Sequence, residues 1–132
     1  ALQKELDKFI QEVIPKLKDT PATKDAGTLV WASGFCRAMY LGTSTVAGYD
    51  NPKPEQLAMF RYGSMIDYFI EYFSKEAGDS FKNHEVVKSL LVSLKKIKVS
   101  VDKIPQVVKP DEVVKMKEEI KSISETLKSQ FE

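Results

Sequence analysis

Apolar residues recur every three or four positions through most of the chain, the period of a helix that is buried on one face. The first stripe consists of Leu2, Leu6, Phe9, Val13 and Leu17. Pro15 interrupts it, and a proline inside a helix removes one backbone hydrogen bond and clashes with the preceding turn. We therefore predict a first helix that is kinked or broken near residues 12–15 and ends at residues 19–21.

A second helix is predicted from Asp25 to about Leu41. It is apolar around most of its circumference, through Leu29, Val30, Ala32, Phe35, Cys36, Met39 and Tyr40. A helix of this kind is usually central in a fold. Residues 42–53 contain glycine, hydroxyl and proline residues and are expected to form a loop.

A third helix is predicted over residues 54–77. Pro54 and Glu55 suit a first helical turn, and Gly78 suits a helix end. The apolar stripe of this segment is Leu57, Phe60, Ile66, Phe69, Ile70 and Phe73.

Two further helices complete the predicted set. The fourth begins near Ser80 or Asn83 and ends at Pro105, although residues 98–102 also alternate as a strand would; we favour a helix that frays after Val99. The fifth covers residues 110–131 and has a heptad-like seam of Val113, Met116, Ile120, Ile123 and Leu127. The seam is expected to cover the central helices, with a coiled-coil oligomer as the alternative.

The pattern as a whole predicts an all-α fold: a single domain over residues 1–132, a bundle of about five helices with residues 25–41 and 54–77 at its centre. Eleven of the thirteen aromatic residues lie between Trp31 and Phe81, whereas residues 26–60 carry just four charges. The middle of the chain is therefore expected to hold the core or the binding site, with charged segments around it.

Net charge restricts the class of partner. The chain carries a formal charge of +1, which argues against nucleic-acid binding, since that function needs a strong positive excess. Residues 82–109 hold seven lysines against Glu85 and Asp102, a net of +5. We interpret them as a solvated face; an anionic membrane surface is the alternative that we do not favour. One cysteine leaves the compartment open between the cytoplasm and, if a leader preceded Ala1, the periplasm or the exterior.

Two arginines, Arg37 and Arg61, fall within the two most apolar predicted helices. Arginine keeps its charge when partly buried and can bind a carboxylate with two parallel hydrogen bonds. Asp67 and Glu71 lie four residues apart and so share one helix face. We expect Arg37 or Arg61 to pair with one of these acids between helices, or else Arg37 to bind an anionic ligand or partner residue.

Catalytic and metal chemistry find little support. His84 is the single histidine and Cys36 the single cysteine, so a metal site lacks nitrogen and sulfur ligands and a nucleophile lacks a base. We expect Cys36 to act as a small apolar side chain and His84 to have a structural or surface role. No cofactor, metal or enzymatic activity is predicted.

Five tyrosines in the middle of the chain favour a protein-binding function. A dry core does not need so many hydroxyl groups, and tyrosine is enriched at interface hot spots. We predict that several of Tyr40, Tyr49, Tyr62, Tyr68 and Tyr72 are exposed on one surface of an inhibitor, immunity, chaperone or adaptor type of protein. The alternative is a carrier or sensor that holds an apolar small molecule between rings such as Trp31, Phe35, Phe60, Phe69 and Phe73.

Overall fold

The computed structural model describes residues 2–16 and 22–131, and helix is the regular secondary structure found there. The predicted all-α fold is confirmed. Leu17 and residues 19–21, where the first helix is predicted to end, lie outside the described residues.

The first helical segment changes type along its length. Helix α1 spans Leu2–Lys8, a π-helical turn follows over Phe9–Val13, and a 3₁₀ turn over Ile14–Lys16 contains Pro15. Because Pro15 cannot donate a hydrogen bond to the carbonyl of Gln11, the preceding turn cannot keep the regular α pattern. The distortion predicted near residues 12–15 is present and begins a few residues earlier, at Phe9.

Helix α2 spans Ala22–Ala47 and is longer than predicted. Residues 42–47, predicted to belong to a loop, are helical. Their hydroxyl groups bond back to the helix: Thr43 Oγ1 donates to the Met39 carbonyl at 2.6 Å and Thr45 Oγ1 to the Leu41 carbonyl at 2.8 Å. Val46 is buried, so packing extends the helix to this point.

The segment predicted as one helix over residues 54–77 is divided. Helix α3 spans Pro54–Ala58, helix α4 spans Gly63–Glu71, and a π-helical turn covers Tyr72–Glu76. The division occurs at Phe60, whose side chain is buried against α2. Its ring packs so closely on Gly42 that a Cβ added to Gly42 would lie 3.0 Å from Phe60 Cε1. The free energy gained by burying Phe60 favours a break in the helix at residues 59–62.

The C-terminal half follows the predictions closely. Helix α5 spans Asp79–Lys82, α6 spans Glu85–Val101, and a 3₁₀ turn over Pro110–Glu112 leads into α7, Val113–Phe131. Residues 98–101 are helical, which excludes the strand alternative. The α7 side chains predicted to form a seam are buried from Met116 to Leu127.

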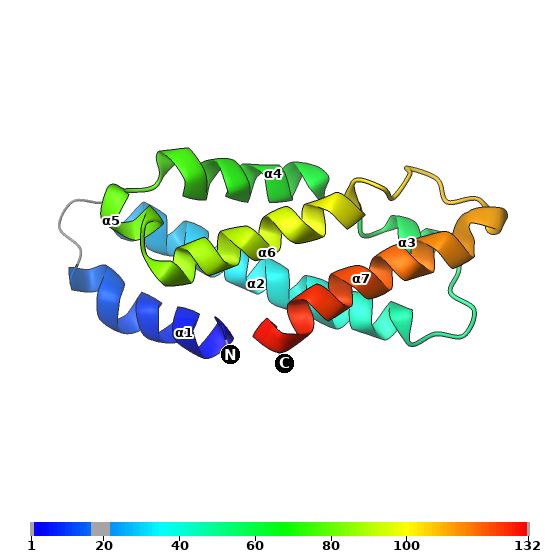
Figure 1. Cartoon of the computed structure of the whole chain (residues 1–132), viewed down its shortest axis with the longest axis horizontal. Coiled ribbons are helices and arrows are strands. Elements are labelled where there is room, and N and C mark those ends of the chain that lie inside the picture. Colours follow the sequence, from blue (N-terminus) through cyan, green and yellow to red (C-terminus); the bar gives the residue numbers. More distant parts are fainter. Residues whose placement is uncertain (1, 17–21, 132) are drawn as a thin grey trace.

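Figure 1 shows the arrangement: α6 and α7 cross in front of α2, α4 lies along one side of α6, and α1 lies on the other side. Helix α2 packs extensively on α7, and α6 packs on both α7 and α4. Helices α6 and α7 therefore share the centre of the bundle with α2, and α4 is more peripheral than predicted. Aromatic rings occupy the space between α2 and α4.

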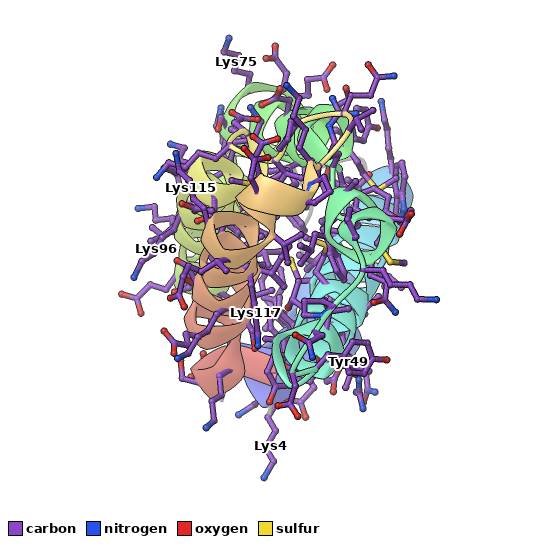
Figure 2. All side chains as sticks on the ribbon, turned by 90° about the vertical axis from the view of Figure 1, so that its right-hand side faces the viewer. Lys4, Tyr49, Lys75, Lys96, Lys115 and Lys117 are labelled. Atoms are coloured by element: carbon purple, nitrogen blue, oxygen red, sulfur yellow. The ribbon has the colours of Figure 1, made fainter. Side chains whose placement is uncertain are left out.

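Charged side chains surround this bundle. In Figure 2, Lys96 and Lys115 project from the side formed by α6 and α7, whereas Tyr49 lies on the opposite side, just beyond α2. None of the helices in the described part of the chain is long and apolar enough to cross a bilayer.

Candidate functional site

An apolar groove of about 940 Å³ runs along the outer face of α2, between this helix and the segment that contains α3 and α4. Helical spacing of three and four residues places one row of α2 side chains along it. This row consists of Val30, Trp31, Gly34, Ala38, Leu41 and Thr45. The facing wall is formed by Met59, Phe60, Tyr62 and Met65, and Tyr49 and Gln56 also line the groove.

Three small residues of α2 line the groove. Gly34, Ala38 and Gly42 follow one another at intervals of four, so they lie in line on α2. A Cβ placed on Gly34 would meet nothing within 4 Å, whereas one on Gly42 would contact the Phe60 ring. Gly42 thus serves the close approach of Phe60, and Gly34 leaves open space in the groove.

A network of rings fixes the end of the groove near Trp31. The Trp31 ring meets Phe69 edge-on at 4.9 Å between centroids and Tyr68 at 5.5 Å. Phe35 contacts Tyr62 at 5.7 Å and Phe69 at 5.6 Å. The Trp31–Phe69 and Phe35–Tyr62 pairs are edge-to-face, an arrangement that stabilises aromatic clusters beyond their buried area. Phe69 is fully buried, so it anchors the exposed rings above it.

The walls of the groove combine hydrophobicity with exposure. Trp31 is 49% exposed, Leu41 55% and Met59 56%. Among the described residues, no charged side chain lines the groove. The hydroxyl of Thr45 bonds back to its own helix, so the tyrosine hydroxyls and the Gln56 amide are the main polar groups available to a bound molecule.

The five tyrosines occupy different environments. Tyr49, Tyr62 and Tyr68 are exposed and lie in the groove or beside Trp31. Tyr40 is half-buried against the core and does not line the groove. Tyr72 is buried, and its hydroxyl donates to Asp25 Oδ1 at 2.5 Å. Burial, followed by this hydrogen bond, raises the Tyr72 pKa well above its ordinary value.

The predicted pairing of an arginine with Asp67 or Glu71 is corrected by the structure. Asp67 lies 3.1 Å from the Lys98 ammonium, and Glu71 lies 3.7 Å from that of Lys75. A lysine one helical turn away, or on the neighbouring α6, reaches these acids more directly than an arginine on α2. Lys98 also contacts Asp102 at 2.7 Å, and its hydrogen bonds to Asp102 and then Asp67 raise the Lys98 pKa.

The two arginines lie in separate places. Arg61 donates from Nε to the Ile104 carbonyl at 3.2 Å, beside a small polar depression and outside the apolar groove. Arg37 is exposed on α2, one turn from Gly34 and Leu41. No described residue forms an ion pair with Arg37.

Cys36 and His84 are both part of the packed structure. Cys36 is fully buried, and burial raises the pKa of its thiol to about 12. His84 precedes α6, accepts a hydrogen bond at Nδ1 from the Val86 amide at 3.3 Å, and stacks on Phe9. Within the described residues, no cluster of histidine, cysteine and acidic side chains could hold a metal ion.

Sequence reasoning missed several groove residues. Val30, Leu41 and Met59 are exposed wall residues that had been assigned to the core or left without a role. The available signal was the apolar character of α2 on every side, which exceeds what a helix with one solvent-facing side needs. Asp25 was also missed: it is fully buried and joins the start of α2 to Tyr72.

Comparison with protein-family models, with curated proteins and with solved structures found no match for this chain.

Proposed function

We propose that this protein binds a helical segment of another protein in the groove beside α2. The observation that carries the proposal is an exposed apolar surface without charge. Among the described residues, seven of the eleven exposed large hydrophobic side chains lie in the groove or beside it: Val30, Trp31, Leu41, Tyr49, Met59, Tyr62 and Tyr68. The other four are valines, at positions 92, 99, 107 and 114, and of these Val107 shares a smaller depression with Met59.

The area of this surface supports a protein partner. With about 150–250 Å² for a side chain of this size, the exposed fractions of the seven residues amount to on the order of 700 Å². A stable protein interface buries about 800 Å² on each partner. The patch therefore has the size of one side of an interface.

The shape of the groove supports a helix in particular. The distance along α2 from Val30 to Val46 is about 24 Å at the rise of an α-helix, which corresponds to a partner helix of about 16 residues. Gly34 and Ala38, one turn apart on the open side of α2, allow a second helix to approach α2 closely. A helix that inserts apolar residues at intervals of three and four is an established mode of recognition.

A selection experiment tests this function. A displayed library of amphipathic helical peptides of about 16 residues is selected on the wild-type protein. Trp31 is the single tryptophan of the chain, so its emission reports binding directly. We expect the selected peptides to carry an apolar stripe and to shift the Trp31 emission to shorter wavelength.

Two glycine variants supply the control. Gly34→Leu fills the groove, whereas Gly27→Leu places the same side chain on an exposed part of α2 that does not line it; neither Cβ meets a neighbour within 4 Å. We expect Gly34→Leu to abolish peptide binding and Gly27→Leu to preserve it. The proposal is contradicted if the library yields no binder, or if the binders have the same affinity for Gly34→Leu as for the wild type.

The volume of the groove favours one other function. About 940 Å³ is within the range of about 300–1,000 Å³ that small-molecule sites occupy. Trp31, Phe35 and Phe60 line the groove, and Phe69 lies beneath the first two; Phe73 is buried in the core. A carrier of an apolar molecule predicts a rise in Tm with fatty acids, haem or flavin in a thermal-shift panel, which Gly34→Leu removes. We favour the helix, because small-molecule sites enclose most of their ligand and these walls are half exposed.

A further inference from the structure

Arg37 lies next to the groove and has no ionic partner among the described residues. It is the single charged residue between positions 26 and 49. A shallow depression of about 300 Å³ contains Arg37 and shares Val30 and Gly34 with the groove. The two hollows therefore adjoin each other at Val30 and Gly34, and Arg37 lies on the α1 side of the apolar surface.

The charged groups around this surface differ in how far they are already paired. Asp7 also lines the depression, and its Oδ1 accepts a hydrogen bond from Gln3 Nε2 at 3.0 Å. Across the groove, Asp67 pairs with Lys98, Glu71 with Lys75, and Arg61 with the Ile104 carbonyl. Within the depression, Arg37 and Asp7 are the charged residues without an ionic partner among the described residues, and Arg37 is the one of the two that can bind an acidic group.

We infer that the partner helix carries an acidic residue beside its apolar stripe, and that its carboxylate pairs with Arg37. This inference rests on the proposed function and states the chemistry of the segment that fills the groove. Guanidinium binds carboxylate in a planar arrangement of two parallel hydrogen bonds, which fixes orientation as well as position. A helix in the groove presents the polar residues of one flank to the α1 side, where Arg37 lies. An acid on that flank therefore fixes the direction of the helix along the groove and its rotation about its own axis.

A peptide series tests the inference. One selected groove-binding peptide is made with glutamate, glutamine or lysine at each polar position that flanks its apolar stripe. At one such position we expect glutamate to bind wild-type protein about two- to fivefold more tightly than glutamine, the range expected for an exposed ion pair. The preference should weaken as salt is raised.

Substitutions on the protein complete a double-mutant cycle. Arg37→Gln should remove the preference for glutamate, and Arg37→Glu should replace it with a preference for lysine. Arg61→Gln is the matched control, since this arginine lies outside the groove, and it should leave the preference unchanged. The cycle separates a direct pair from a general loss of affinity.

The outcomes separate this inference from the proposed function. If peptides bind and are blocked by Gly34→Leu but glutamate gives no advantage that depends on Arg37, the acidic partner is overturned and the helix-binding function stands. If no peptide binds and oleate binds in an Arg37-dependent manner, both proposals fail, because the carboxylate then belongs to a small amphiphile. If Arg61→Gln removes the glutamate preference as Arg37→Gln does, the effect is a general one and the pair is also overturned.

Discussion

The hydroxyl of Tyr72 donates a 2.5 Å hydrogen bond to a buried carboxylate oxygen of Asp25, which joins the start of α2 to the turn that follows α4. The second oxygen of Asp25 accepts from the Gly78 amide at 3.2 Å. Asp25 lies in the first turn of α2, where a negative charge complements the helix dipole. This contact holds the two segments that carry the rings behind the groove.

Removing the Tyr72 hydroxyl tests that role. Tyr72→Phe leaves one oxygen of a buried carboxylate without its donor, which costs about 1–3 kcal/mol. We expect a loss of this size in the free energy of unfolding, measured with urea. Tyr68→Phe is the control, because Tyr68 is exposed and adjacent on α4. Equal stabilities for the two variants would show that the Asp25 contact contributes nothing.

The glycines of α2 should respond differently to alanine. In a helix interior, alanine is favoured over glycine by about 0.5–1 kcal/mol when its methyl group has room. Gly27 and Gly34 have that room, so Gly27→Ala and Gly34→Ala should both stabilise the protein by about this amount. Gly42→Ala should fall short or destabilise, because its Cβ would lie 3.0 Å from a buried ring atom of Phe60. The denaturation midpoints of the three variants test this prediction. Equal gains in stability for all three would contradict the close approach of Phe60 to Gly42.

Cys36 should make stability depend on alkaline pH. In the unfolded chain its thiol ionises near pH 8.5, whereas burial raises its pKa to about 12 in the folded protein. Between these values the unfolded state binds fewer protons, so the stability present below about pH 8.5 is lost as pH rises. The expected loss from this group is about 2 kcal/mol between pH 8.5 and pH 10.

The Cys36→Ala variant isolates the contribution of this thiol to the pH dependence of stability. The variant should show a shallower decline of unfolding free energy between pH 8.5 and pH 10 than the wild type. The Tyr72 pKa is raised too, so a further decline that begins near pH 10 should remain in both proteins.

A thiol reagent such as dithionitrobenzoate should react with native protein only at the rate at which the fold opens and exposes Cys36. Parallel pH profiles, or immediate labelling, would contradict the burial of Cys36.

Oxidation of methionine should report on the wall of the groove. Met59 is 56% exposed, whereas Met39 and Met116 are each 3% exposed. Limited hydrogen peroxide should therefore convert Met59 to its sulfoxide well before Met39 or Met116, as peptide mass mapping would show. The polar sulfoxide should weaken the binding of groove peptides, and Met59→Leu should protect binding from peroxide. Oxidation of Met39 first would mean that the core side of α2 is accessible.

The patterns that could be predicted are local ones. Helical periodicity is a property of neighbouring residues, so α6 and the buried face of α7 follow their apolar stripes directly. The position of Cys36 in the core follows from the same patterns, whereas the exposure of several tyrosines was predicted from the number of hydroxyl groups that a dry core would have to satisfy. Where one buried side chain changed the course of the backbone, prediction failed: Phe60 divides residues 54–77 into α3 and α4, and Thr43 and Val46 extend α2 to Ala47.

The amino-acid sequence by itself determined that this protein is helical, which faces of its later helices are buried, and that its rings gather in the middle of the chain. The tertiary structure decided that α2 has an open side and that Val30, Trp31, Leu41 and Met59 form one surface. It also decided that Asp67 meets Lys98 while Arg37 keeps no partner among the described residues. The physical reason is that periodicity gives the phase of each helix about its own axis, whereas the side on which the next helix packs depends on contacts between residues far apart in the chain.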